Sequence, residues 1–249
     1  MSSAGELVLY RKSGSVAHII LNRPERLNAV NLEMRDLLWT YFGAVRDDGD
    51  VRALVISGSG EAFSAGADIS EFGTAPSIVE SRRGRRERDL WALLLSIDRP
   101  VVAAIRGYAL GAGLEMALCC DFRVATRDAI FGLPEVRLGY IPSAGGTQLL
   151  PRTVRGALAR QMIMTGLPTD AGRALQAGLV TSVVDATDPL PEAEAIAGRL
   201  AGRPQAALAA AKLALAVTRE TTLTTGLARE KAIALSINRT AAGAGSDPR

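Results

Sequence analysis

Two glutamates in strongly apolar surroundings are the residues of this sequence best suited to acid–base chemistry. Glu115 lies between Leu114 and Met116 in the segment GYALGAGLEMALCCD, and Glu135 follows later in FGLPEVRLG. Burial disfavours the charged form of a carboxylate and raises its pKa, and a second carboxylate nearby raises the pKa further. Such a pair could hold one water molecule, with one glutamate deprotonating the water while the other donates a proton.

Each glutamate also has a structural interpretation. It could lie at the surface beside an apolar patch, or at a helix N-terminus, where the helix dipole favours a carboxylate. The spacing along the chain does not by itself bring Glu115 and Glu135 together in space.

Three loops rich in small residues could supply backbone N–H groups to a ligand. They are FSAGAD, ALGAGLE and IPSAGGTQ, and each is predicted to follow a strand and to lead into a helix. Helix N-termini have unpaired N–H donors, and small residues let a ligand approach the backbone. Two donors that converge on one point would form an oxyanion hole. The alternative for each loop is an ordinary tight turn.

Other catalytic classes lack their motifs. The sequence has no G-x-G-x-x-G, no G-x-x-x-x-G-K-S/T and no G-x-S-x-G, so neither a nicotinamide or flavin cofactor nor a serine triad is supported. The one histidine, His18, lies in the apolar run VAHIIL and is interpreted as a packed structural residue. No zinc-site spacing is present, so no metal and no cofactor are expected.

A run of arginines, SRRGRRER at residues 81–88, is the most unusual charged segment. Charge runs are usually solvated, and the functional alternative is a contact with an anionic ligand such as a phosphate. Nucleic-acid binding is the least favoured interpretation, because no aromatic residues interleave the arginines and the net charge of the chain is only +3.

The bulk composition is that of a soluble cytoplasmic protein. Hydrophobic residues make up 48% of the 249 residues, which supports a sizeable core. Cys119 and Cys120 are adjacent and cannot form an ordinary disulfide, so they are expected to be reduced and buried. Neither a signal peptide nor a membrane-spanning run is recognised.

The elements that must position these residues alternate in type. A hairpin is predicted around KSGS, a helix over 27–48, short apolar strands in VRALVISG, PVVAAIRG, DFRVATR and AIFGLPE, and a helical segment from GGTQ to MIMTG. This order predicts an α/β fold with repeated strand–strand–helix turns. From about residue 189 the chain becomes alanine-rich and helical. We therefore divide it into a core over 1–188 and a helical region over 189–249 with a frayed tail.

These motifs, in this order and at these spacings, resemble the enoyl-CoA hydratase/isomerase (crotonase) family. The resemblance begins at LNRPERLNAV, includes FSAGAD, GYALGAGLEMALCCD and FGLPEVRLGYIPSAGGTQLLPR, and ends near Val184. It implies a spiral of strand–strand–helix turns. It also implies C-terminal helices that assemble the subunits into a homotrimer or a hexamer formed from two trimers.

The resemblance also implies an acyl-CoA thioester substrate and assigns roles to residues. The backbone N–H groups of Ala67 and Ala112 would hold the thioester oxygen, Glu115 would orient and activate water, and Glu135 would transfer a proton at the α carbon. The implied activity is an enoyl-CoA hydratase that gives a 3-hydroxyacyl-CoA in fatty-acid or related acyl-CoA degradation. The alternatives are an enoyl-CoA isomerase of this family and a non-catalytic acyl-CoA-binding protein.

The contacts with coenzyme A follow from the same resemblance. They are assigned to Arg26, Leu27, Ala29, Ala65, Asp68, Ile69, Leu110, Gly111 and Pro134. Two features depart from the family: Ser70 replaces a common lysine, and the segment from residue 236 to the end lacks the usual acidic–glycine pair and basic cluster. Either the binding of coenzyme A is looser in this chain, or the arginines at 82–88 compensate.

Overall fold

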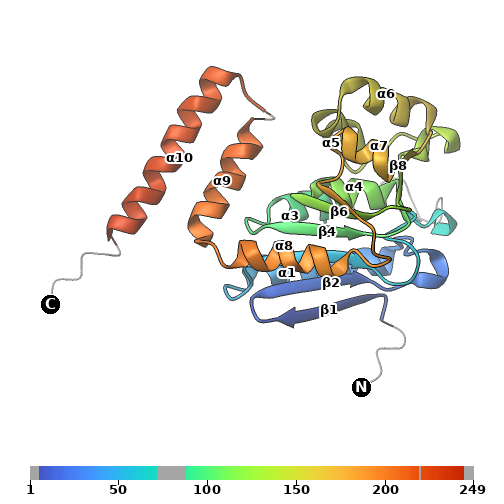
Figure 1. Cartoon of the computed structure of the whole chain (residues 1–249), viewed down its shortest axis with the longest axis horizontal. Coiled ribbons are helices and arrows are strands. Elements are labelled where there is room, and N and C mark those ends of the chain that lie inside the picture. Colours follow the sequence, from blue (N-terminus) through green and yellow to red (C-terminus); the bar gives the residue numbers. More distant parts are fainter. Residues whose placement is uncertain (1–5, 72–87, 219, 244–249) are drawn as a thin grey trace.

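The computed structural model describes residues 6–71, 88–218 and 220–243, with side chains up to residue 237 (Figure 1). The arginine run at 81–88 therefore lies outside the described residues except for Arg88, which forms an exposed ion pair with Asp36. The predicted frayed tail lies almost wholly outside them as well.

A six-stranded sheet forms the centre of the molecule. Its strands have the order β1-β2-β3-β4-β6-β9. They are β1 (Val8–Ser13), β2 (Val16–Leu21), β3 (Ala53–Gly58), β4 (Val101–Ile105), β6 (Phe122–Thr126) and β9 (Ser182–Val184). The predicted hairpin is present as the antiparallel pair β1–β2, and all the other neighbours are parallel. A parallel sheet is covered on both faces, which explains the continuous apolar runs of its central strands.

Alternate residues of the strands face two separate apolar clusters. On one face, α1 (Leu32–Asp47) buries Met34, Leu38 and Phe42 in the larger cluster, and α3 (Leu90–Leu95) adds its buried leucines to it. On the other face, α8 (Leu190–Ala201) packs Ala193, Ala197 and Ala201 against β3, β4 and β6. Alanines four residues apart form one stripe of a helix and let it lie close to the sheet. The first helix of the 189–249 region thus covers the sheet of the core.

A second, three-stranded sheet runs beside the first and explains the rhythm of the sequence. It contains β5 (Tyr108–Leu110), β7 (Ile130–Gly132) and β8 (Thr169–Asp170). After β4 the chain adds β5 and then α4 (Ala112–Cys119). After β6 it adds β7, then a 3-10 segment η3 (Pro134–Leu138), and then α5 (Gly146–Thr153). The predicted α/β fold with strand–strand–helix turns is confirmed.

Two predicted helices have different bounds in the structure. The helix predicted over 27–48 starts only at Leu32, because Leu27 and Asn28 adopt φ values of 49° and 55°, in the left-handed region. A 3-10 segment η1 (Pro24–Arg26) precedes them, and the Asn31 side chain caps the helix. The helical segment predicted from GGTQ to MIMTG is two helices, α5 and α6 (Gly156–Thr165), because the backbone leaves the helical conformation at Val154.

The remaining helices complete the chain. A short helix α7 (Ala171–Gln176) links β8 to β9, and α9 (Gln205–Val217) and α10 (Leu223–Gly243) stand to one side of the sheets (Figure 1). Lys212 of α9 donates to Asp121 Oδ2 at 2.7 Å and to the Arg99 carbonyl at 2.9 Å, which joins this helix to the entry of β4. In the part of the chain that the structure describes, no helix is both long and apolar enough to cross a membrane.

Candidate active site

Glu115 occupies the first turn of α4, a helix whose eight residues are all buried. The side chain is only 2% exposed, and its Oε1 accepts hydrogen bonds from the backbone N–H groups of Ala144 and Gly146, both at 2.8 Å. Burial raises the pKa of Glu115, and the two N–H donors lower it in part. The carboxylate is therefore a buried group whose anionic form has two fixed hydrogen bonds.

The IPSAGGTQ loop is shaped to make those two hydrogen bonds. It follows η3 rather than a strand, which corrects the expectation from the sequence, and it leads into α5 as expected. A Cβ atom at Gly146 would lie 3.0 Å from Glu115 Oε1 and 2.8 Å from Pro142 Cβ. Only glycine fits at this position, because the loop backbone lies directly against the carboxylate.

Glu135 lies in η3, immediately after β7. Its Oε2 is buried, and within the described residues it has no hydrogen-bond partner. The pKa of Glu135 is raised to about 7, first by burial and further by the charge of Glu115, against the effect of its own backbone N–H. The fold thus brings into electrostatic contact the two glutamates that the sequence singled out.

Gly111 lies next to Glu135, to the backbone of Glu115 and to the FSAGAD loop. A Cβ atom at Gly111 would lie 3.1 Å from Glu135 Oε1 and 3.8 Å from the Cα of Gly66. The residue has φ 49° and ψ −126°, and its carbonyl accepts the N–H of Glu115 at 2.9 Å. Both glutamates and the FSAGAD loop therefore surround this one backbone position.

The N–H groups of Ala67 and Ala112 are both available to a ligand. Within the part of the chain that the structure describes, neither donates a hydrogen bond. The carbonyl of Gly66 accepts the N–H of Val30 at 2.7 Å, and because the peptide is trans, the N–H of Ala67 points the opposite way. A Cβ atom at Gly66 would lie 3.5 Å from the Ala112 nitrogen, so the two donors belong to adjacent segments.

The residues assigned to coenzyme A lie on two loops that are joined by backbone hydrogen bonds. Ala65 N–H donates to the Leu27 carbonyl at 2.9 Å, and Asp68 N–H donates to the Val30 carbonyl at 3.0 Å. Arg26, Leu27 and Ala29 are on the first loop, and Ala65, Asp68 and Ile69 are on the second. Leu110 ends the neighbouring strand β5, Gly111 is the N-cap of α4, and Pro134 starts η3. Ile69, in the 3-10 segment η2 (Ile69–Glu71), is 64% exposed.

Hydrogen bonds to both carboxylate oxygens hold the side chain of Asp68 in place. Its Oδ1 accepts the hydroxyl of Ser70 at 2.7 Å, and its Oδ2 accepts Nη1 of Arg23 at 2.6 Å. These two hydrogen bonds, together with one from the backbone N–H of Ser70, lower the pKa of Asp68 to about 2. Arg23 also donates to the Ala29 carbonyl, so the ion pair fastens the two loops together. Arg23 was not singled out from the sequence, although it is part of the NRP segment that marks this loop.

His18 lies away from the glutamates, on β2. It is 8% exposed, and its Nε2 is 2.8 Å from the hydroxyl of Ser57 on β3. Burial lowers the pKa of His18 to about 4, so the ring is neutral at physiological pH. Among the described residues, no three His, Cys, Asp or Glu side chains gather in a group that could hold a metal ion.

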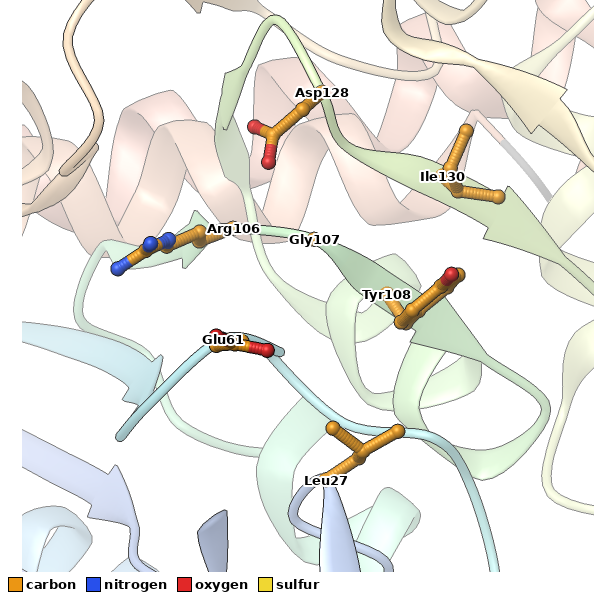
Figure 2. A pocket seen from close by; sticks show the side chains of 7 residues that line it. All are labelled: Leu27, Glu61, Arg106, Gly107, Tyr108, Asp128 and Ile130. Atoms are coloured by element: carbon orange, nitrogen blue, oxygen red, sulfur yellow. The ribbon is translucent and has the colours of Figure 1, made fainter.

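A pocket of about 310 Å³ opens at the Gly107 turn between β4 and β5, next to the Leu27 loop. Its lining residues are Leu27, Glu61, Arg106, Gly107, Tyr108, Asp128 and Ile130. Figure 2 shows the charged side chains on one side of Gly107 and Tyr108 and Ile130 on the other. The pocket shares Leu27 with the loop assigned to coenzyme A but contains neither glutamate.

Comparisons with known proteins find a family model, curated relatives and solved structures that are similar to this chain. The family model described as enoyl-CoA hydratase/isomerase matches residues 11–243. The chain is 42% identical over 217 residues to the crotonyl-CoA hydratase of Syntrophomonas wolfei (85% of this chain, 82% of that protein). It is 40% identical over 226 residues to the 2,3-dehydroadipyl-CoA hydratase of Escherichia coli (91% and 88%). The crystal structure of an enoyl-CoA hydratase from Bacillus anthracis superposes with a TM-score of 0.87 at 33% identity, covering 94% of this chain and 92% of that chain.

Proposed function

Because the chain belongs to the enoyl-CoA hydratase/isomerase (crotonase) family of enzymes, we propose that it adds water to a 2-enoyl-CoA to give a 3-hydroxyacyl-CoA. One observation carries the proposal: Glu115 and Glu135 both lie beside Gly111, next to the N–H groups of Ala67 and Ala112, which no described residue accepts. Hydration of a conjugated thioester needs a base for water, an acid for carbon and a site for negative charge on oxygen.

The two N–H groups serve the thioester oxygen. Attack of water at the β carbon moves the electrons of the double bond toward the carbonyl and creates an enolate-like oxyanion. Ala67 and Ala112 would donate to this oxygen, and Ala112 adds the positive end of the α4 dipole. Because both donors are backbone groups, an alanine at position 112 serves as well as a glycine.

The different surroundings of the glutamates divide their roles. The two N–H bonds from Ala144 and Gly146 favour the anion of Glu115, which suits it to take a proton from water. Glu135 has a buried oxygen without a hydrogen-bond partner among the described residues and a pKa of about 7, so a large fraction is protonated at neutral pH. As Glu115 takes one proton from water, the hydroxyl forms the new bond to the β carbon. Glu135 would deliver its proton to the α carbon of the resulting enolate, and proton exchange with solvent resets the two carboxyl groups.

The test follows the loss of the conjugated thioester absorbance with crotonyl-CoA and with a longer 2-enoyl-CoA. Glu115→Gln and Glu135→Gln keep the shape of the site and remove proton transfer. Each is expected to lower kcat by about a hundredfold or more. Glu192→Gln on helix α8, where Glu192 forms an ion pair with Arg199 at 3.7 Å, is the matched control and should retain full activity.

The same assay separates the alternatives. An isomerase would move the double bond of a 3-enoyl-CoA and would depend chiefly on Glu135, since it needs no water. A non-catalytic acyl-CoA-binding protein would bind both thioesters without turnover. Either result would contradict the proposed hydratase activity.

We also propose that the enzyme is a cytoplasmic homotrimer or hexamer that acts in fatty-acid or related acyl-CoA degradation. The helices α9 and α10 expose Leu213, Leu215, Leu223, Leu227 and Leu235, an apolar surface that self-association would cover. The adjacent free thiols of Cys119 and Cys120 fit a reducing compartment. Analytical ultracentrifugation measures the assembly, and a monomer at micromolar concentration would contradict it.

A further inference from the structure

Ser64 is a fully buried residue that contacts both segments proposed to hold the thioester oxygen. We infer that its hydroxyl is a positioning group that sets the relative placement of the Ala67 and Ala112 N–H groups. The inference rests on the proposed function, because it assumes that these two groups bind a thioester oxygen. Ser64 does not touch the substrate in this proposal and acts only through the backbone.

The hydroxyl of Ser64 connects two loops. It donates to the carbonyl of Asn28 at 2.8 Å and accepts the N–H of Gly66 at 3.2 Å. The carbonyl of Gly66 is held separately by the N–H of Val30. Gly66, with φ 105°, is thus fixed at both of its polar groups, and the peptide that carries the Ala67 N–H cannot rotate freely.

The acceptor of this hydroxyl is itself rigid. Asn28 is fully buried, and its side chain accepts the N–H of Arg23 and donates to the carbonyls of Ser59 and Ala62, all within 2.8 Å. These bonds hold its left-handed backbone in place. The Asn28 carbonyl is therefore a fixed point to which Ser64 fastens the FSAGAD loop.

Ser64 also contacts the start of α4, where the second donor lies. Its N–H donates to the Tyr108 carbonyl and its carbonyl accepts the Leu110 N–H, which joins it to β5. A Cβ atom at Gly113 would lie 2.6 Å from the Ser64 carbonyl oxygen and 2.7 Å from its Cβ. Gly113 directly follows Ala112, so the first turn of α4 rests on Ser64.

Removal of the Ser64 hydroxyl would break its hydrogen bonds to Asn28 and Gly66 and keep the backbone bonds of Ser64 to β5. In Ser64→Ala the backbone pairing with β5 remains, whereas the Asn28 carbonyl and the Gly66 N–H lose a partner in a buried place. The Ala65–Gly66 peptide then loses its anchor, and the adjoining Gly66–Ala67 peptide, which keeps the bond from the Val30 N–H to the Gly66 carbonyl, can shift with it relative to α4. We expect weaker polarisation of the thioester and a kcat lowered by about tenfold, less than the loss of a whole oxyanion donor, with little change in KM.

The experiment uses butyryl-CoA labelled with ¹³C at the thioester carbonyl, which lacks the double bond that hydration needs. Infrared difference spectra give the carbonyl stretch of the bound thioester, and crotonyl-CoA turnover is measured in parallel. The matched control is Ser57→Ala, which removes another buried, hydrogen-bonded serine hydroxyl, the partner of His18. Thermal unfolding compares the folding of all the variants.

Wild-type protein is expected to shift the stretch to lower frequency on binding, and Ser64→Ala to lose about half of that shift or more. Ser57→Ala should lose stability and keep both the shift and kcat. If Ser64→Ala does not fold, Ser64→Cys, which retains a weak donor, is compared in its place and should show a smaller loss.

The outcomes separate this inference from the proposed function. A full shift and full turnover in the folded Ser64 variant would overturn the role of Ser64 and leave the hydratase activity standing. A wild-type protein that shifts the stretch without hydrating crotonyl-CoA would overturn the proposed function, and the variant's shift would still decide the role of Ser64. No shift in wild type would overturn the inference outright.

Discussion

The carboxylate of Glu115 accepts the backbone N–H of Gly146 at 2.8 Å, across 31 residues of sequence. This bond joins the first turn of α4 to the loop that opens α5. It holds the buried glutamate in one orientation and favours its anion, which is the form that a base for water requires. The position of a loop glycine and the protonation state of the proposed base are therefore coupled.

Gly146→Ala tests that coupling. The new Cβ would lie 3.0 Å from Glu115 Oε1 and 2.8 Å from Pro142 Cβ, so the loop must retreat and one N–H donor is lost or lengthened. We expect crotonyl-CoA hydration to fall by about a hundredfold. Gly198→Ala is the control, because it lies within α8 with open space around it, and it should raise stability by up to about 1 kcal/mol at full activity. Full activity of Gly146→Ala would show that the loop does not orient Glu115.

The pH dependence of hydration should report the protonation of Glu135. The acid form delivers the proton to carbon, and its pKa of about 7 implies that kcat/KM for hydration declines as the pH rises above 7. The residual activity of Glu135→Gln should lack this decline, because glutamine does not titrate. A wild-type profile that stays level from pH 6 to pH 9 would contradict the role of Glu135 as the acid.

The ion pair of Arg23 and Asp68 should matter more to ligand binding than a surface pair does. Both side chains are about 85% buried and fasten the two loops assigned to coenzyme A. Arg23→Gln leaves the Asp68 carboxylate without its cation, and we expect a loss of about 2 kcal/mol in the free energy of unfolding and a several-fold weaker Kd for butyryl-CoA. Arg46→Gln, from the exposed pair with Asp47, should change neither quantity measurably. Calorimetric titration measures the Kd, and urea unfolding measures the free energy of unfolding. Equal effects of the two substitutions would refute the assignment of these loops to coenzyme A.

His18 should make the fold sensitive to mild acid. Its pKa is about 4 in the folded protein and about 6.5 in an unfolded chain, so the unfolded state binds more protons as the pH falls below 6.5. Stability is then lost progressively toward pH 4, by about 2 kcal/mol at pH 5.

Glu135 contributes to the pH dependence of stability with the opposite sign, because folding raises its pKa. Protonation of Glu135 therefore stabilises the folded protein as the pH falls below 7, over part of the range in which His18 destabilises it. The effect of His18 is therefore the difference between wild type and His18→Gln in urea unfolding at pH 8 and pH 5. The difference in free energy of unfolding between wild type and His18→Gln should be smaller at pH 5 than at pH 8. A difference that stays constant would show that His18 is protonated equally in the folded and the unfolded state.

The residue types and their order sufficed to predict the architecture and the candidate glutamates. Apolar neighbours identified Glu115 and Glu135, and the alternation of strands, glycine loops and helices predicted the strand–strand–helix turns. Apolar patterning could not place the start of α1, because Leu27 and Val30 fit a helical face although Leu27 and Asn28 are left-handed. Backbone conformation of this kind is set by contacts such as those of Asn28, which are distant in sequence.

The partners of the glutamates could not be predicted, because they depend on how the turns dock. The IPSAGGTQ loop was recognised as a source of N–H donors, but nothing in its spacing assigns Ala144 and Gly146 to Glu115. The ion pair of Arg23 and Asp68 was missed for the same reason, since the two residues lie 45 positions apart. These contacts depend on how distant segments pack together, and local sequence propensity does not determine them.

The two-sheet spiral has a consequence for the order in which the enzyme matures. Ala67 follows β3, Ala112 and Glu115 follow β5, and Glu135 follows β7, so three successive turns of the chain each contribute one part of the site. A ribosome releases these turns one after another, and the last parts, Ala144 and Gly146, emerge after all of them. The strands β8 and β9, which complete the two sheets, emerge later still, so every part of the site is synthesised before either sheet is complete.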